Sequence, residues 1–343
     1  MIELREDELV FSYPEVHEEA VFRIGFQRTL RIPDDGHEYP PPAGLGSFPV
    51  RHVDDFQRTV PAAWLAHGGV MLPMHQAEAM WLNFSAGRYP FAVKVAAGKV
   101  NAVSGKPWST ALNSGPASRG PARSGRRIPA GQDYLVIPDQ PWLDGFNVGE
   151  GSIRQFVAMP LGDGYTAEEQ LTGRAEHGGL QLLAYPMKAA AYAELPPETV
   201  YDGAPPMMAC GAAAMPEMGL GLGGLMHQEI AADGYGVDVW DLNHPARCFV
   251  HLANADVWTS ITGARPQTSP PTPRQYRAAG IPWFDYTLVG PRVPGAENLA
   301  ALGSVAELVA AERGELADNE SIPVDRVIPV NRQGRRSTVR EYE

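Results

Sequence analysis

Hydrophobic and polar positions alternate in short runs along most of the chain, and glycine or proline ends nearly every run. Val93 and Val95 flank Lys94, and residues 21–32 alternate in the same way toward their end. Further apolar runs bounded by glycine or proline lie at 133–138, 153–161, 178–187 and 248–263. A period of two is typical of a half-buried strand, whereas an amphipathic helix repeats every 3.6 residues. The pattern therefore predicts a mainly β protein.

Three short helices are predicted from local signals. Ser304 and Glu307 have the spacing of a capping box, and Gly314 stands where the helix over 305–313 should end. The other predicted helices are 273–279, capped by Thr272 and ended by Gly280, and 188–195. We expect few helices, all short, with a capped one near the C-terminus.

Composition supports the β assignment. The chain of 343 residues has 36 glycines and 32 prolines, and both residue types interrupt regular structure. Hydrophobic residues make up 44%, enough for a sizeable core. The predicted fold is a β-sandwich or a barrel-like sheet, formed by residues 1–343 as a single compact domain.

A second organisation stays open, in which the chain contains two related β units. Residues 68–105 and 223–263 each contain paired glycines, then Met-His-Gln, then a tryptophan. They end in segments of equal length, 91–105 and 249–263, that both read as strand, turn and strand. Few positions are identical. A true duplication predicts two β units that face each other across a pseudo-two-fold axis.

The charge balance narrows the range of partners. The chain has 40 acidic against 28 basic residues, a formal net charge of −12. Because a negative surface repels polyanions, we expect no nucleic acid and no membrane among its partners. Arginines gather at 116–127, inside a predicted flexible loop over 109–131, and again in a predicted tail over 329–343. The role of the loop arginines is left open.

The sequence also indicates in which cellular compartment the protein is located. Its acidic start, MIELREDELVF, lacks the basic head and apolar run of a secretory signal, and the chain has no apolar stretch of membrane-spanning length. Cys210 and Cys248 are interpreted as reduced, small apolar residues. A soluble cytoplasmic protein is predicted.

Four segments resemble a family of uncharacterised bacterial and fungal proteins. They are QPWLDGF (140–146), RQFVAMPLG (154–162), CFVHLAN (248–254) and AGIPWFDY (279–286). The resemblance covers most of the chain from about residue 30 to 320. It implies no activity, so the function has to be argued from the residues.

Gly219, Gly221 and Gly224 satisfy the G-x-G-x-x-G spacing of a dinucleotide-binding loop. That loop requires a buried strand before it and a long helix after it, so that backbone amides meet the pyrophosphate. Here a proline precedes the glycines closely, and Gly234 and Gly236 follow too soon for a long helix. The glycines are therefore interpreted as allowing close backbone approach at the entry to a strand. No cofactor is predicted from them.

Two His/Glu pairs are candidate metal ligands. His75 with Glu78, and His227 with Glu229, recur at matching places in the two resembling segments. If the units pack face to face, one His and one carboxylate from each could hold a divalent ion, and Gln76 and Gln228 would orient the imidazoles. His251 is a further candidate, on the period of two of its predicted strand. The alternative for every histidine is an ordinary hydrogen-bonded side chain.

Tryptophans beside aspartates are candidate ligand-binding residues. Asp144 follows Trp142 by two positions, and Asp241 follows Trp240 directly. Aromatic faces stack on sugar rings, and an acid beside an indole is the environment in which glycosidases raise a carboxyl pKa. The usual role of tryptophan is core packing.

The leading functional hypothesis is a binding or self-assembling protein, since no nucleophile elbow or metal motif is present. β-rich chains often associate through sheet faces or edges, so a homo-oligomer is expected. The alternatives are a metal-dependent enzyme with a His/Glu site between two β units, and a carbohydrate-binding or carbohydrate-active protein. Whether the protein is an enzyme stays open.

Overall fold

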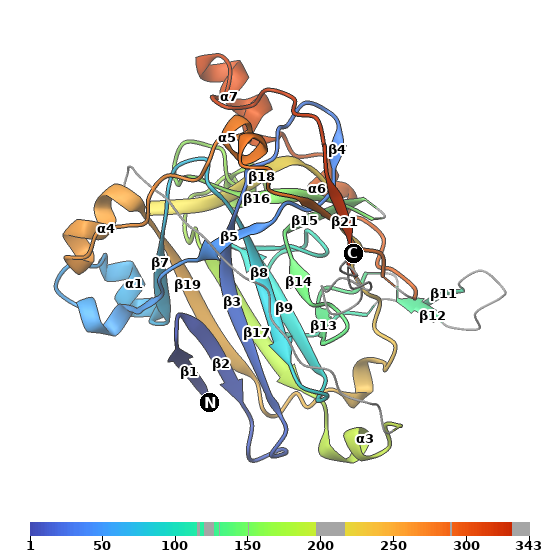
Figure 1. Ribbon diagram of the computed structural model, residues 1–343. Helices are drawn as coiled ribbons and strands as arrows, with labels where there is room; N and C mark the ends of the chain where they lie inside the picture. The colour runs from blue at the N-terminus through green and yellow to red at the C-terminus, as the bar shows by residue number, and fades with distance from the viewer. Residues whose placement is uncertain are drawn as a thin grey trace, which may run out of the picture.

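The computed structural model describes residues 1–114, 117–119, 127–129, 131–149, 151–196, 217–288 and 290–330 (Figure 1). The fold is mainly β, with 36% of residues in strands and 17% in helices. The predicted fold class is therefore confirmed. The described strands do not close into a barrel.

Most strands belong to one large sheet. Its members are β1 (Ile2–Arg5), β2 (Glu8–Ser12), β3 (Val21–Thr29), β4 (Glu38–Tyr39), β5 (Gly44–Ser47), β6 (Arg51–His52), β7 (Val70–Met74), β8 (Ala79–Ala86), β9 (Phe91–Ala97), β10 (Val100–Asn101), β13 (Leu135–Ile137), β14 (Trp142–Leu143), β15 (Gly145–Gly149), β16 (Ser152–Pro160), β17 (Leu180–Pro186), β18 (Glu217–His227) and β19 (Ala246–Asn254). Two small pairs lie outside it: β11 (Ala117–Arg119) with β12 (Arg127–Pro129), and β20 (Trp283–Asp285) with β21 (Val327–Pro329).

Pairing between neighbouring strands runs along one continuous path. Antiparallel pairs join β1, β2, β3, β8, β16, β18, β19, β17 and β9 in that spatial order. β7 joins the other side of β19 as a parallel strand. In this spatial order β17 lies between β9 and β19, although β9 and β19 are far apart in the sequence. This three-stranded part of the sheet carries the candidate site.

The main core lies against this sheet and is filled by apolar side chains. Phe11, Phe22 and Phe91 stack on one another, with ring centroids 4.7 Å and 4.5 Å apart. Leu180, Leu182 and other buried residues of β17 join the same cluster. Burying such side chains contributes roughly 1.5–3 kcal/mol each. All residues of β9 and nearly all of β17 are buried, so consecutive as well as alternate residues of these strands enter the core.

The helices are short, as expected. They are η1 (Val53–Phe56), α1 (Ala62–His67), α2 (Ala167–Thr172), α3 (Ala189–Ala193), η2 (Val237–Val239), α4 (Ala255–Thr262), α5 (Pro273–Ala278), α6 (Glu297–Ala300) and α7 (Val305–Arg313). The predicted helices correspond to α3, α5 and α7. Ser304 and Glu307 form the predicted capping box of α7, and Thr272 forms one with Gln275 at α5.

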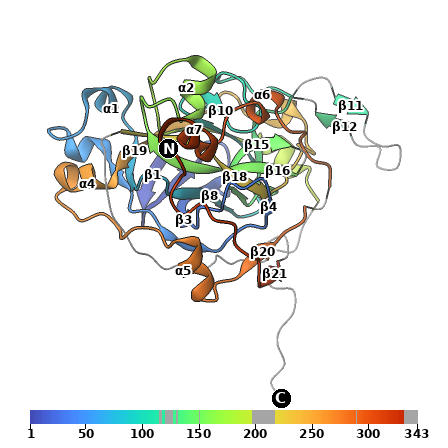
Figure 2. The ribbon, with the colours of Figure 1, turned by 90° about the horizontal axis from the view of Figure 1, so that it is seen from above.

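One predicted strand is wrong. Residues 248–263 are not strand, turn and strand, because the chain leaves β19 at Asn254 and forms α4. Asn254 caps this helix and Gly263 ends it in a left-handed conformation. Trp258 of α4 packs with Trp64 of α1 in a separate core cluster, and Figures 1 and 2 show the two helices side by side. This packing favours a helix despite the β-branched residues of the segment.

The difference also weakens the predicted duplication. Residues 91–105 form the hairpin of β9 and β10, whereas 249–263 form part of β19 and then α4. The glycines from Gly219 to Gly224 lie inside β18 rather than at its entry, and the next helix is only the short η2. A side chain at Gly224 would collide with the backbone oxygen of Pro33, so close approach is what this glycine supplies.

Several sequence predictions lie outside the described residues. These are most of the arginine-rich loop 116–127, the tail from 331 onward, and Cys210. Within the described part of the chain, no helix is both long and apolar enough to cross a membrane.

Candidate functional site

One face of β17 and β19 carries most of the chemically useful side chains. Alternate residues of a strand point to one face, so Arg247, Phe249 and His251 of β19 lie together. Register pairs Leu183 with Arg247 and Gln181 with Phe249, which places the β17 residues on the same side. We call this surface the β17–β19 face.

A hollow of about 410 Å³ lies at one end of the β17–β19 face. It is lined by Thr110, Leu183, Tyr185, Leu242, Pro245 and Arg247. Leu242 is 53% exposed, so the hollow opens to solvent. A volume of this size suits a small organic ligand, and the walls present polar and apolar surface in nearly equal amounts.

Arg247 is the charged group of the hollow. Among the described residues, no carboxylate pairs with its guanidinium and no hydrogen bond engages it. It lies close enough to Tyr185 to act on the phenol: burial raises the pKa of Tyr185, and Arg247 opposes that rise. A guanidinium presents a planar set of donors that matches carboxylate and phosphate oxygens. The hollow therefore has the chemistry for an organic anion.

A buried ion pair holds the wall that contains Thr110. Lys94 of β9 donates to a carboxylate oxygen of Asp133 at 2.9 Å and also to the backbone oxygen of Ala111. Asn113 donates to the same carboxylate from its backbone and side chain, at 2.9 Å and 2.6 Å. The side chains of Lys94 and Asp133 are 1% and 4% exposed. The loop that forms the wall is thus fixed from beneath.

Tyr185, which lines the hollow, also fixes the wall that contains Thr110. Its hydroxyl donates to the backbone oxygen of Thr110 at 2.7 Å. The hydroxyl oxygen keeps acceptor capacity that a ligand could use.

Three imidazoles gather at the other end of the β17–β19 face. His67, at the end of α1, stacks on Phe249 with centroids 4.8 Å apart and planes 7° apart. Its ring lies 5.5 Å from that of His177 and 6.1 Å from that of His251. We call His67, His177 and His251 the imidazole cluster. The rings of His67 and His251 are stacked, whereas those of His67 and His177 are tilted by 32°.

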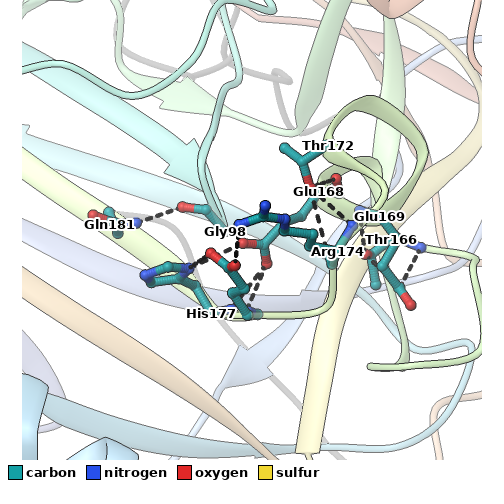
Figure 3. A network of polar contacts seen from close by, with 10 residues as sticks. Gly98, Thr166, Glu168, Glu169, Thr172, Arg174, His177 and Gln181 are labelled. Carbon is teal, nitrogen blue, oxygen red and sulfur yellow. Dashed lines mark hydrogen bonds and ion pairs between the residues drawn. The ribbon is translucent and has the colours of Figure 1, made fainter.

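His177 is held by a buried carboxylate, that of Glu168 in α2 (Figure 3). Its ring Nδ1 lies 3.1 Å from Oε1 of Glu168. The other carboxylate oxygen accepts from the backbone amides of His177 and Gly178, at 3.2 Å and 2.8 Å. Gly98, at the turn between β9 and β10, has no side chain and so leaves room for this carboxylate. Glu168 fixes both the loop and the ring that it carries.

Burial lowers two histidine pKa values in the cluster. His251 is 1% exposed, and burial brings its pKa to about 4, against the raising effect of the bond between Nε2 and the Gly68 oxygen. Its Nδ1 has no hydrogen-bond partner among the described residues. Burial also lowers the pKa of His67, helped by His177 and Lys99. Both rings are therefore held in their neutral form at pH 7.

The structure separates the two predicted metal-ligand pairs. The Glu78 backbone oxygen accepts from Ala158 at one end of β16, whereas His227 pairs with Ser152 at the other end. Six residues of strand put these backbone positions roughly 20 Å apart, too far for two imidazoles to share one ion. The described residues contain no group of three or more His, Cys, Asp or Glu side chains arranged to hold a metal ion.

Each of the four residues has other partners. Glu78 forms a buried ion pair with Arg28 at 2.5 Å, and burial raises its pKa to about 7 against the lowering effect of Arg28. His75 Nε2 contacts the backbone oxygen of Gln267 at 2.9 Å. Glu229 forms an ion pair with Arg292 at 2.9 Å. Nε2 of His227 lies 4.0 Å from the same Glu229 carboxylate. Instead of orienting an imidazole, Gln228 bonds Asp144 at 2.6 Å.

The predicted tryptophan and aspartate residues are mostly buried. Trp240 is 1% exposed, and its indole donates to Asp233 at 3.1 Å, so neither ring face is offered to a sugar. Asp144 is 3% exposed, and burial raises its pKa to about 7 against hydrogen bonds from Trp142 and Gln228. Oδ2 of Asp241 lies 2.8 Å from Nδ1 of His244. Only Trp142 and Asp241 are partly exposed.

The sequence interpretation missed Arg247, His67, His177 and Glu168. Arg247, His67 and the pair of Glu168 and His177 come from three separate segments, and even the members of the pair are nine residues apart. One signal was present: in RCFVHL, the period of two puts positions 247, 249 and 251 on a single face. No family model, curated protein or solved structure matches this chain, so the site rests on its own geometry.

Proposed function

We propose that the protein binds a small organic anion in the hollow at the end of the β17–β19 face. The observation that carries this proposal is the Arg247 guanidinium, which lacks a carboxylate partner among the described residues and stands at the edge of a 410 Å³ hollow. The apolar body of the ligand would contact Leu242 and Pro245, both exposed at the hollow. At about 30 Å³ per water-sized group, the hollow has room for about a dozen non-hydrogen atoms.

The proposal keeps the binding-protein reading of the sequence and gives it a ligand class. Hydrogen bonds to charged groups contribute about 1.5–3 kcal/mol each, so the anion should decide affinity. A carboxylate and a phosphate monoester share this chemistry, and the hollow itself does not distinguish them.

Octanoate is the first probe, because its ten non-hydrogen atoms match the hollow. In an NMR titration we expect octanoate to bind saturably and neutral 1-octanol to bind more weakly. Comparison with octyl phosphate identifies the preferred anion. Arg247→Ala should weaken octanoate binding at least about tenfold, equivalent to about 1.4 kcal/mol.

Arg23→Ala is the matched control. It removes the same charge from an exposed position on β3, a strand that does not adjoin β17 or β19. Equal affinity for octanoate and 1-octanol, or equal losses in the two arginine variants, would refute anion binding at Arg247.

A further inference from the structure

We propose that His177 is a second recognition group for the same ligand, and that it accepts a hydrogen bond from a hydroxyl on that ligand. This inference rests on the proposed function, since it assumes an anion at Arg247. It adds the ligand class: an organic acid with an apolar arm for the hollow and a hydroxyl-bearing arm that extends to the imidazole cluster.

The partner of His177 determines which of its ring nitrogens donates a hydrogen bond and which accepts one. An ionised carboxylate only accepts hydrogen bonds, so Nδ1 of His177 must donate to Glu168 across the 3.1 Å contact. In the neutral ring the other nitrogen, Nε2, is then an acceptor. Figure 3 shows Nε2 at the ring edge that points away from Glu168. It makes no hydrogen bond to any residue that the structure describes.

The ring of His177 is fixed in position and is still reachable from solvent. The Glu168 side chain is 3% exposed and has backbone amides on its second oxygen, so it is fixed before any ligand arrives. The His177 side chain is 16% exposed. A fixed acceptor with an open edge suits recognition, because little ordering is left to occur on binding.

Distance along the strand fits one small ligand. The His177 and Phe249 ring centroids are 6.4 Å apart. Arg247 is two residues from Phe249 on the same face, a step of about 6.7 Å. Adding the two distances puts the Arg247 backbone roughly 13 Å from the His177 ring, and the arginine side chain covers part of that interval. Phe249 lies between them, and the part of it that His67 leaves exposed gives the connecting arm an apolar contact.

N-octanoyl-L-tyrosine tests this arrangement. Its carboxylate would meet Arg247, its octanoyl arm would fill the hollow, and its phenol would pass Phe249 to reach His177. At pH 8 we expect it to bind at least about tenfold more tightly than N-octanoyl-L-phenylalanine, which lacks only the hydroxyl. The O-methyl ether of the tyrosine probe, which cannot donate, should bind like the phenylalanine probe.

Two variants separate recognition from a structural role. His177→Phe keeps an aromatic ring beside His67 but removes the acceptor, so the tyrosine probe should lose its advantage while octanoate binding is unchanged. Glu168→Gln can keep the backbone contacts through its amide oxygen and donate to Nδ1 through its NH₂ group. That exchange moves the ring proton to Nε2, which ¹⁵N NMR of the imidazole would detect, and the hydroxyl preference should disappear.

The two proposals fail in different ways. If octanoate binds through Arg247 but the tyrosine and phenylalanine probes bind equally, the role of His177 is wrong and anion binding stands. If the hydroxyl preference survives in His177→Phe, the acceptor is another residue and the inference is again wrong. If none of the probes binds, both proposals are overturned.

Discussion

Replacing Lys94 with methionine is expected to destabilise the protein by about 3 kcal/mol, because it leaves a buried carboxylate without its cation. Among the described residues, the Asp133 carboxylate would keep only the two hydrogen bonds from Asn113. Methionine has a similar length, so little of the loss would come from packing. Urea denaturation measures the free energy of unfolding directly.

Lys106→Met is the control, since Lys106 lies on the same loop but is exposed. It should change the free energy of unfolding by no more than about 0.5 kcal/mol. In the double variant Lys94→Met with Asp133→Asn, the uncompensated charge is gone, and we expect at least about 1 kcal/mol of the loss to return. Equal stability of the two methionine variants would show that the buried ion pair contributes nothing.

The same substitution connects stability to the proposed site. Lys94 holds the loop through Ala111, and Thr110 of that loop lines the hollow. Folded Lys94→Met protein should therefore bind octanoate more weakly than the wild type, whereas Lys106→Met should not. A buried pair one layer beneath the wall thus positions the ligand without touching it.

Local sequence signals predicted the elements whose formation depends on residues close together in the chain. The boxes at Ser304 and Thr272 satisfy the free amides of a first helical turn within four residues, so α7 and α5 could be placed from spacing alone. The strands followed from apolar alternation for the same reason. Only α4 contradicted its pattern, and there Asn254 and Gly263 were the start and stop signals that the β-branched residues obscured.

The site depends on contacts between distant segments, which spacing does not encode. Glu168 meets His177 through a turn, but His67 reaches Phe249 only because β7 pairs with β19 and α1 precedes β7. The predicted His/Glu pairs relied on a symmetric packing of two repeats, and β16 instead keeps them at opposite ends. Residue types alone gave no reason to prefer His177 over His227.

Acid should destabilise the protein through His251. Its folded-state pKa of about 4 lies below its ordinary value of 6.5, so the unfolded chain takes up a proton that the folded protein resists. The stability is fully present above pH 6.5 and is lost progressively as the pH falls from 6.5 to 4. The shift corresponds to about 3 kcal/mol.

The physical cause is the environment of the ring. His251 lies between Trp64 and Phe249, with centroids 4.7 Å and 4.5 Å away, and protonation would bury a charge whose new Nδ1 proton has no acceptor among the described residues. Protonation of the neighbouring His67 would add repulsion, because the two rings are 6.1 Å apart. Asp144 and Glu78 act in the opposite direction, since burial raises their pKa values to about 7.

A variant comparison isolates the contribution of His251 from these carboxyl groups. His251→Phe keeps a ring between Trp64 and Phe249 but cannot be protonated, although it loses the bond to the Gly68 oxygen at every pH. The difference in unfolding free energy between wild type and His251→Phe should therefore shift by about 3 kcal/mol between pH 7 and pH 4. His52→Phe, at an exposed histidine, should follow the wild type in parallel. A constant difference between wild type and His251→Phe across that range would mean that the buried ring is not what makes the fold sensitive to acid.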